Sequence, residues 1–201
     1  MMDDRKETAN RPDGEMNLTE TALESRIVYQ GSFFDIYKDR IRLPNGQTAT
    51  REYLRHPEAV VILPLFEDGT VLLERQFRYP LDRVFIEFPA GKIDPGEDRL
   101  TSAKRELEEE TGYTASSWRW VTTIHNAIGY SDEQLFLYLA QDLRAGVSHC
   151  DEEEFIQTFR IPLETLLTWV KTGKITDVKT VIGAFWLEKI ASGQWDAEKM
   201  V

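Results

Sequence analysis

The sequence is poor in cysteine, in positive charge and in long apolar runs. Cys150 is the only cysteine among 201 residues, so no disulfide can form within the chain, and a reducing cytoplasm is the expected location. Lysine and arginine number 24 against 35 aspartates and glutamates, which gives a formal net charge of −11. Because nucleic acids and anionic membranes are bound through basic surfaces, we expect neither as a partner. No apolar run is long enough to span a bilayer, and the sequence has no signal-peptide core.

The first 56 residues divide into a polar segment and a run of short strands. Residues 1–25 are polar and aperiodic, which predicts a mobile tail. Residues 26–56 contain three strand-like stretches, and Asn45-Gly46 between the last two is a strong signal of a tight hairpin. We therefore expect a small antiparallel sheet here. Such a sheet is rarely stable alone, so it should pack on its own main domain or on a second subunit.

Residues 57–201 are expected to form the main domain. Two apolar stretches, AVVILPLF and TVLLERQFRY, are joined by a turn at Asp68-Gly69. Later strand-like stretches are VFIEFPA, WRWVTTIH, EQLFLYLAQDL and FIQTFRIP, and two helices are expected at LETLLTWVKTG and at about residues 177–192. Strands and helices in this order predict an α/β or α+β domain in which a mixed central sheet lies between helices.

One further helix is predicted between a glycine-rich turn and Gly112. Glu97 or Asp98 can open it, since a carboxylate there meets free backbone N–H groups. Gly112 can close it in a left-handed conformation. Three apolar residues recur at helical spacing and would face the core, namely Leu100, Ala103 and Leu107.

The carboxylates of this helix are clustered. Glu106, Glu109 and Glu110 project over one face, where like charges repel by roughly 0.2–0.5 kcal/mol per pair. A cation between them would remove that repulsion, and Mg²⁺ typically combines a few carboxylates with substrate phosphates. The spacing therefore suggests a magnesium site for a phosphate substrate, with Arg105 holding a neighbouring carboxylate by paired hydrogen bonds. The alternative is a solvated helix laced with salt bridges.

The segment from Gly91 to Tyr113 resembles the Nudix box, G-x5-E-x7-R-E-U-x-E-E-x-G-U, in which U is a bulky aliphatic residue. The matching positions are Gly91, Glu97, Arg105, Glu106, Leu107, Glu109, Glu110 and Gly112. Tyr113 at the last aliphatic position is the only departure. So many fixed positions in so short a span favour the box over the solvated helix.

Segments outside the box extend the resemblance over roughly residues 26–190. Five segments look like the ADP-ribose pyrophosphatase branch of the Nudix family. They are REYLRHPEAVVILPL, QFRYP, IEFPAGKID, GYSDE and KITDVKTVIGAFWL. The resemblance implies the Nudix fold, Mg²⁺-dependent hydrolysis of ADP-ribose to AMP and ribose 5-phosphate, and a homodimer with exchanged N-terminal sheets. Ile128 stands where the branch carries a proline before the glycine that matches Gly129. Other nucleoside diphosphate sugars or dinucleotides therefore remain alternative substrates. A second alternative function is that of a non-catalytic sensor that binds nucleotide sugars.

The resemblance also implies roles for residues of the box. Glu106 and Glu110 would be the main ligands of two or three Mg²⁺ ions, with Mn²⁺ as the alternative metal. Glu109 would be shared between metal binding and catalysis, and the Ala90 carbonyl would be a further ligand. Arg105 would be one of the catalytic residues.

Outside the box, the resemblance implies a catalytic base and a set of substrate contacts. Glu154 is the expected base, with Glu152 and Glu153 as substitutes. The expected substrate contacts are Arg51, which would reach the partner's site, Arg78, Glu87 and Glu133; surface ion pairs are the alternative for all four. An aromatic residue should stack on adenine, but the sequence does not rank the candidates, which are Phe33, Phe34, Tyr37 and Tyr79.

Overall fold

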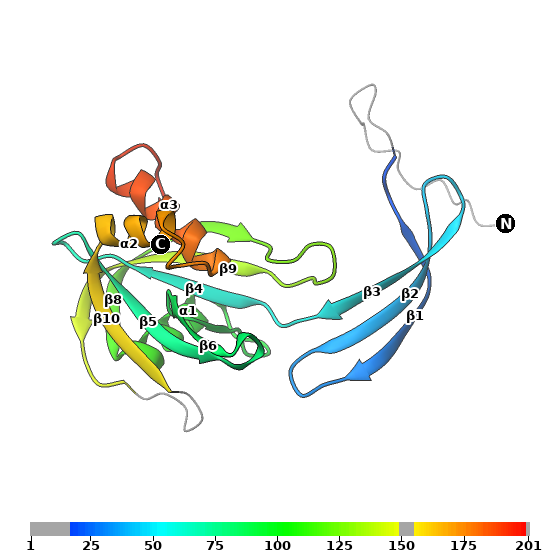
Figure 1. The fold of residues 1–201 in the computed structure, drawn as a ribbon, viewed down its shortest axis with the longest axis horizontal. Helices are drawn as coiled ribbons and strands as arrows, with labels where there is room; N and C mark the ends of the chain where they lie inside the picture. The colour runs from blue at the N-terminus through cyan, green and yellow to red at the C-terminus, as the bar shows by residue number, and fades with distance from the viewer. Residues whose placement is uncertain (1–16, 149–154, 200–201) are drawn as a thin grey trace. The chain divides into compact units, whose positions relative to one another are not determined.

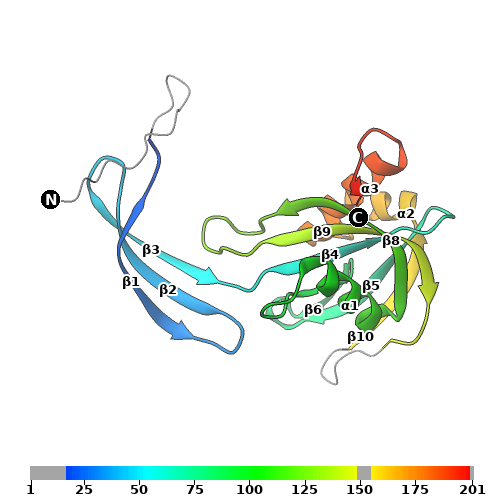
Figure 2. The same cartoon turned by 180° about the vertical axis from the view of Figure 1, so that it is seen from behind.

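The computed structural model describes residues 17–148 and 155–199. The chain divides into two compact units, Met1–Leu54 and Arg55–Val201 (Figures 1 and 2). None of the helices in the described ranges combines the length and the apolar character that a membrane span requires.

The N-terminal unit is a three-stranded sheet in the order β1-β2-β3, built from β1 (Thr21–Gln30), β2 (Asp35–Arg42) and β3 (Thr48–Arg55). β1 and β2 are antiparallel. The strand β1 begins at Thr21, so the expected boundary of the tail at residue 25 is too late; the polar residues Thr21 and Glu24 pair with β2 although they lack an apolar pattern. Residues 1–16 of that tail lie outside the described ranges.

The turn predicted at Asn45-Gly46 is confirmed. Gly46 has a φ of 85°, a conformation that glycine adopts without steric cost. Its N–H donates to the Leu43 carbonyl at 2.9 Å, and the Leu43 N–H donates to the Gln47 carbonyl at 2.8 Å.

The second unit contains two sheets, three α-helices and a short 3-10 helix in its described part. The elements in chain order are β4 (Ala59–Pro64), β5 (Thr70–Arg78), η1 (Tyr79–Leu81), β6 (Arg83–Glu87), β7 (Ala90–Lys92), α1 (Arg99–Thr111), β8 (Tyr113–Ile124), β9 (Leu135–Ala145), β10 (Ile156–Pro162), α2 (Leu163–Lys171), α3 (Val178–Ala191) and β11 (Glu198–Lys199). One sheet has the order β11-β8-β9-β4-β7 and the other β10-β5-β6. β4 runs parallel to β9 and antiparallel to β7, which confirms the mixed sheet.

Strand β4 lies at the centre of two cores. All six of its residues are buried, and alternate side chains point to opposite faces of the strand. Val61 and Leu63 join the core that includes residues of α2 and α3, whereas Val60 and Ile62 join the core under α1. The mixed sheet therefore lies between helices, as predicted from the sequence.

Helix α3 approaches this layer closely. A Cβ at Gly183 would lie 2.6 Å from Leu63 Cδ2 and 3.0 Å from Phe88 Cε2. Glycine leaves room for that approach, which brings the second turn of α3 against Phe88 in the segment between β6 and β7.

Candidate active site

Helix α1 begins and ends as its sequence predicts, and the choice between two opening residues is decided. Asp98 is the N-cap, and its side chain accepts a hydrogen bond from the Thr101 N–H at 3.0 Å. Gly112 closes the helix with a φ of 72°. Ala103 and Leu107 are fully buried, which fixes the rotation of the helix and the direction of its carboxylates.

Arg105 lies at the centre of an ionic cluster on this helix. Its Nη1 donates to Glu106 at 2.8 Å and to Glu109 at 3.0 Å. Its Nε and Nη2 donate to the two carboxylate oxygens of Glu97 at 3.1 and 3.0 Å, and Nη2 also reaches the Lys92 carbonyl at 3.1 Å. One guanidinium therefore joins three glutamates of the box with the strand that precedes it.

Glu97 is the most firmly held of these carboxylates. Hydrogen bonds from Arg105 and then from the buried Ser102 hydroxyl lower the pKa of Glu97 to about 2. The same cluster raises the pKa of Arg105, chiefly through its hydrogen bonds to Glu97. Both groups therefore stay charged at neutral pH.

Glu106 and Glu110 are seated against the backbone of β7. A Cβ at Gly91 would overlap the Glu106 carboxyl group, so the carboxylate approaches the main chain where only a glycine leaves room. Glu110 is 5% exposed, and its Oε2 accepts a hydrogen bond from the Ala90 N–H at 3.1 Å. These contacts bring the two expected main ligands to the strand that carries Ala90.

The described residues 17–148 and 155–199 contain no group of three Asp, Glu, His or Cys side chains arranged to hold a metal ion. Arg105 supplies the positive charge beside Glu106 and Glu109. The donors themselves suit a hard cation, because carboxylate and carbonyl oxygens are the ligands that Mg²⁺ prefers. The glycine that admits the Glu106 carboxylate also agrees with such a site.

Arg78 and Glu87 form a bidentate pair. Arg78 Nε and Nη2 each donate to a different Glu87 oxygen at 2.8 Å. Burial disfavours the ionised form of Glu87, but the hydrogen bonds from Arg78 and the charge of Lys179 outweigh it and lower the pKa of Glu87. The Arg78 side chain is 39% exposed, whereas Glu87 is 2% exposed, so the pair presents the guanidinium to solvent.

The other predicted site residues lie in separate places. Glu133 accepts a hydrogen bond from Asn126 at 3.0 Å and lies 3.4 Å from His56 Nδ1. Arg51 lies in the N-terminal unit, where it pairs with Glu20. Ile128 is 84% exposed. The expected base Glu154, with its substitutes Glu152 and Glu153, lies outside the described residues.

Comparison with known proteins agrees with this geometry. Residues 55–181 match the NUDIX domain. The chain belongs to the Nudix family. Residues 20–54 match the nucleoside diphosphate sugar hydrolase N-terminal domain, which agrees with the start of β1 at Thr21.

Two relatives of this Nudix protein span most of its length. The ADP-ribose pyrophosphatase of Bacillus subtilis is 35% identical over 174 residues, which cover 86% of this chain and 94% of the relative. The methanol dehydrogenase activator of Bacillus methanolicus is 35% identical over 171 residues, covering 84% and 92%. Among solved structures, an ADP compounds hydrolase has a TM-score of 0.80 at 26% identity and covers 90% of this chain and 98% of its own. The protein is a Nudix pyrophosphohydrolase, as the sequence predicted.

Three contributors to the Nudix site were not anticipated. Ser102 supports Glu97, and Lys179 and Asp177 of the α3 region form a chain of ion pairs with Glu87. Asp177 had a sequence signal, because an aspartate three residues before a threonine at a helix start is typical of an N-cap. Lys179 had none, because a lysine in a helix normally faces solvent.

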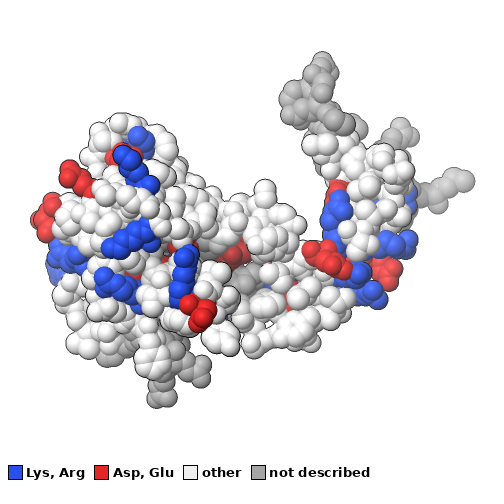
Figure 3. Space-filling view, viewed as in Figure 1, with Lys and Arg blue, Asp and Glu red and all other residues white. Residues whose placement is uncertain are grey.

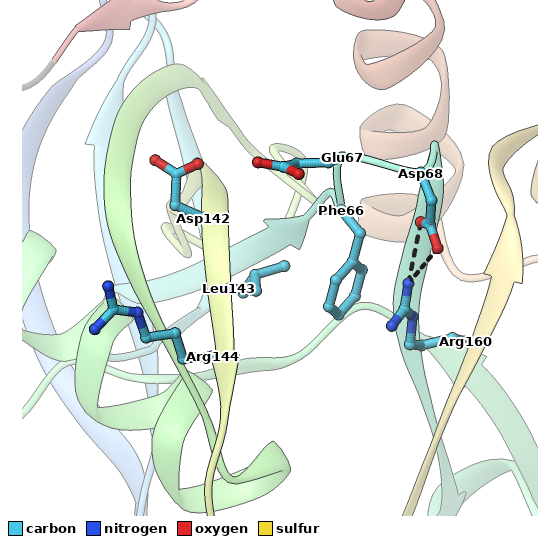
Figure 4. Close-up of a pocket in the computed structure, with 7 residues that line it drawn as sticks. All are labelled: Phe66, Glu67, Asp68, Asp142, Leu143, Arg144 and Arg160. Atoms are coloured by element: carbon cyan, nitrogen blue, oxygen red, sulfur yellow. Dashed lines mark hydrogen bonds and ion pairs between the residues drawn. The ribbon is translucent and has the colours of Figure 1, made fainter.

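A separate open cavity of about 410 Å³ lies on another part of the domain. Figure 4 shows its lining residues, which are Phe66, Glu67, Asp68, Asp142, Leu143, Arg144 and Arg160. Arg160 is already paired with Asp68 and stacks 3.5 Å over the Phe66 ring. None of the predicted site residues lines it. On the face drawn in Figure 3, basic side chains are interspersed with acidic and uncharged ones.

Proposed function

We propose that this protein hydrolyses the pyrophosphate bond of ADP-ribose and releases AMP and ribose 5-phosphate in a magnesium-dependent reaction. The observation that carries the proposal is the cluster around Arg105, in which Glu97, Glu106 and Glu109 share one guanidinium. The relative named ADP-ribose pyrophosphatase, which aligns over most of the chain, supports the choice of substrate.

The metal would be held by the carboxylates that lie against β7. Glu106 and Glu110 are the proposed main ligands, with Glu109 shared and the Ala90 carbonyl as a further donor. Bound divalent ions stabilise negative charge on phosphoryl oxygens and lower the pKa of a coordinated water. Two or three ions would offset the charges of substrate and protein together. Arg105 would hold Glu97 and Glu109 in place as the substrate enters.

The expected substrate contacts are Arg51, Arg78, Glu87 and Glu133. Glu87 is 2% exposed and already accepts hydrogen bonds from Arg78 and Lys179, so the proposed direct contacts are Arg78 and Glu133 in the domain, and Arg51 from the N-terminal sheet of a partner subunit. Arg78 suits a phosphate because its planar fork donates two parallel hydrogen bonds. Glu154 is the proposed base, with Glu152 and Glu153 as substitutes.

The proposed assembly is a homodimer with exchanged N-terminal sheets. Apolar residues of β1 support it, because Ile27, Val28 and Tyr29 are about half exposed within the described chain. A sheet of three strands normally needs its apolar face covered to be stable. A second subunit would supply that cover.

The test is a comparison of substrates with and without magnesium. ADP-ribose, ADP-glucose, NADH, GDP-mannose and diadenosine polyphosphates are offered separately, and the products are separated and identified. We expect magnesium-dependent release of AMP and ribose 5-phosphate, and we expect ADP-ribose to be hydrolysed fastest. A faster reaction with another compound would move the assignment to that nucleotide, and Ile128 would be the first residue to examine. Tight binding without any turnover would identify a nucleotide-sugar sensor.

A further inference from the structure

A buried chain of ion pairs lies beneath Arg78. Glu87, at the end of β6, accepts hydrogen bonds from Arg78 on one side and from the Lys179 ammonium on the other. Lys179 also donates to Asp177 at 3.0 Å. The Lys179 side chain is 10% exposed and that of Glu87 is 2% exposed. The sequence of contacts is therefore Arg78, Glu87, Lys179, Asp177, in which Glu87 is the most buried side chain and Asp177, at the start of α3, is 18% exposed.

Burying the ammonium group of Lys179 costs free energy, which its contacts must offset. A buried lysine loses its hydration, and a buried ion pair is often no more stabilising than apolar residues of the same size. Glu74, which lies opposite Glu87 in the pairing of β5 with β6, is also fully buried. Arg78 already donates to both oxygens of Glu87, so the charge of Glu87 is paired without Lys179.

The geometry around Glu87 indicates a role for Lys179. Both of its carboxylate oxygens are engaged by Arg78, and one of them also accepts from Lys179. Arg78 uses Nε and Nη2 for this pair, and its Nη1 donates no hydrogen bond within the part of the chain that the structure describes. A guanidinium fixed along one edge presents its other edge in a defined direction.

Helix α3 joins this pair to the strand of the box. The Asp177 side chain caps the helix by accepting from the Thr180 N–H at 3.0 Å, and the Thr180 hydroxyl accepts from the Phe88 N–H at 3.0 Å. Phe88 lies two residues before Ala90, whose N–H binds Glu110. The first turn of α3 therefore contacts the segment that connects Glu87 to the carboxylates of the box.

We propose that Lys179 is a positioning residue, which holds the Glu87 carboxylate and through it orients the Arg78 guanidinium toward a phosphate of the substrate. The inference rests on the proposed function for the identity of that phosphate. Glu87 then acts through Arg78 and does not itself contact the substrate. Lys179 is a residue of the second helix after the box, and it contributes to substrate binding without touching the substrate.

The first test is Lys179→Met, which keeps the length of the side chain and removes its charge. We expect KM for ADP-ribose to rise about tenfold to a hundredfold, the range that a small misplacement of a binding group costs, with kcat within about threefold of wild type. Lys189→Met is the matched control, because Lys189 lies on the same helix and, among the described residues, its ammonium group pairs only with its neighbour Glu188 at 3.8 Å. It should leave both constants unchanged.

Two further variants separate positioning from a general loss of structure. In an Arg78→Ala background, Lys179→Met should raise KM no further, since the effect passes through Arg78. If Lys179→Met alone does not fold, the double variant Glu87→Gln, Lys179→Met replaces it. This double variant removes one charge of each sign, so it leaves no buried charge unbalanced and should keep the fold. It should still show the raised KM, because glutamine cannot form the charge-assisted pair with Arg78. Additive effects, or an unchanged KM in the folded double variant, would overturn the proposal.

A crystal structure of the Lys179→Met or double variant gives a readout that does not depend on turnover. We expect the Arg78 side chain to leave its wild-type position, while the Arg105 cluster is retained. If the wild-type protein hydrolyses none of the offered nucleotides, the proposed function fails and this structure alone decides the inference. An Arg78 guanidinium in the same place as in the wild type would refute the role of Lys179.

Discussion

Strands β1 and β4 belong to the two units of the chain, and they are held in different ways. Nine of the ten residues of β1 are exposed, whereas all six residues of β4 are buried. Both strands pair with neighbours through their backbones. Only β4 adds burial on both of its faces, and burial is the main favourable contribution to folding. The domain therefore contains both the buried core and the ionic cluster around Arg105, while the N-terminal sheet exposes apolar residues of β1.

The largest expected effect is on the ionic site of the domain. Glu106→Gln removes the charge of a proposed metal ligand and weakens its pair with Arg105. Since loss of a residue that merely supports a ligand costs 10–100-fold, loss of the ligand's charge should lower kcat/KM for ADP-ribose by at least about a hundredfold. The measurement is initial-rate kinetics at saturating magnesium, with circular dichroism to verify the fold.

The matched control for this variant is Glu108→Gln on the same helix. Glu108 is exposed, and no side-chain contact of Glu108 is recorded among the described residues. Its activity should stay within about twofold of wild type, because surface substitutions of this kind are nearly neutral. Equal activity of the Glu106 and Glu108 variants would remove Glu106 from the metal site.

The next effect tests the difference in burial directly. Leu137 of β9 is fully buried in the core of the domain, so Leu137→Ala should lower the free energy of unfolding by about 2–5 kcal/mol. Ile27→Ala in β1 should change the free energy of unfolding of the domain by less than about 0.5 kcal/mol, because Ile27 belongs to the N-terminal unit and not to the core of the domain. All five tryptophans lie after residue 117, so denaturant titration followed by tryptophan fluorescence reports the domain alone. A large loss from Ile27→Ala by this probe would mean that the two units do not differ as described.

The proposed cover of the N-terminal sheet is tested by mixing subunits. Arg51→Ala and Glu106→Gln homodimers should both be inactive if each site needs its own Glu106 and the partner's Arg51. Refolding the two variants together at equal concentration gives half heterodimers, each with one intact site. About a quarter of the wild-type activity should therefore return. Absence of recovery, with heterodimers demonstrated by mass spectrometry, would count against the exchange.

The sequence predicted the domain well where local patterns agree with burial. The caps of α1, the turn at Asn45-Gly46 and the mixed sheet all follow from residue types whose conformations are set over a few positions. It predicted the start of β1 poorly, because Thr21 to Glu24 combine polar and apolar residues without a clear alternation, and their pairing with β2 is set by a neighbouring strand. Lys179 was missed for another reason: its partner Glu87 is 92 residues away, and a single sequence gives no signal for a contact that only the packing of α3 creates.

The smallest expected effect concerns the support of Glu97 within the box. The folded pKa of Glu97 is about 2 against an ordinary value of 4.5, so its ionised form stabilises the native state above pH 4.5, and this stabilisation is lost as the pH falls from 4.5 toward 2. Ser102→Ala removes one of the hydrogen bonds that lower this pKa and should cost about 1 kcal/mol at pH 7.

The loss of stability on acidification should then be smaller in Ser102→Ala than in wild type, since part of what acid removes is already absent. Denaturant titrations between pH 7 and pH 3 measure it, with Ser116→Ala at an exposed position of β8 as the control. A Ser102→Ala curve that runs parallel to that of the control would show that the hydroxyl does not set the pKa of Glu97, and that Arg105 and the Asp94 N–H lower it without the hydroxyl.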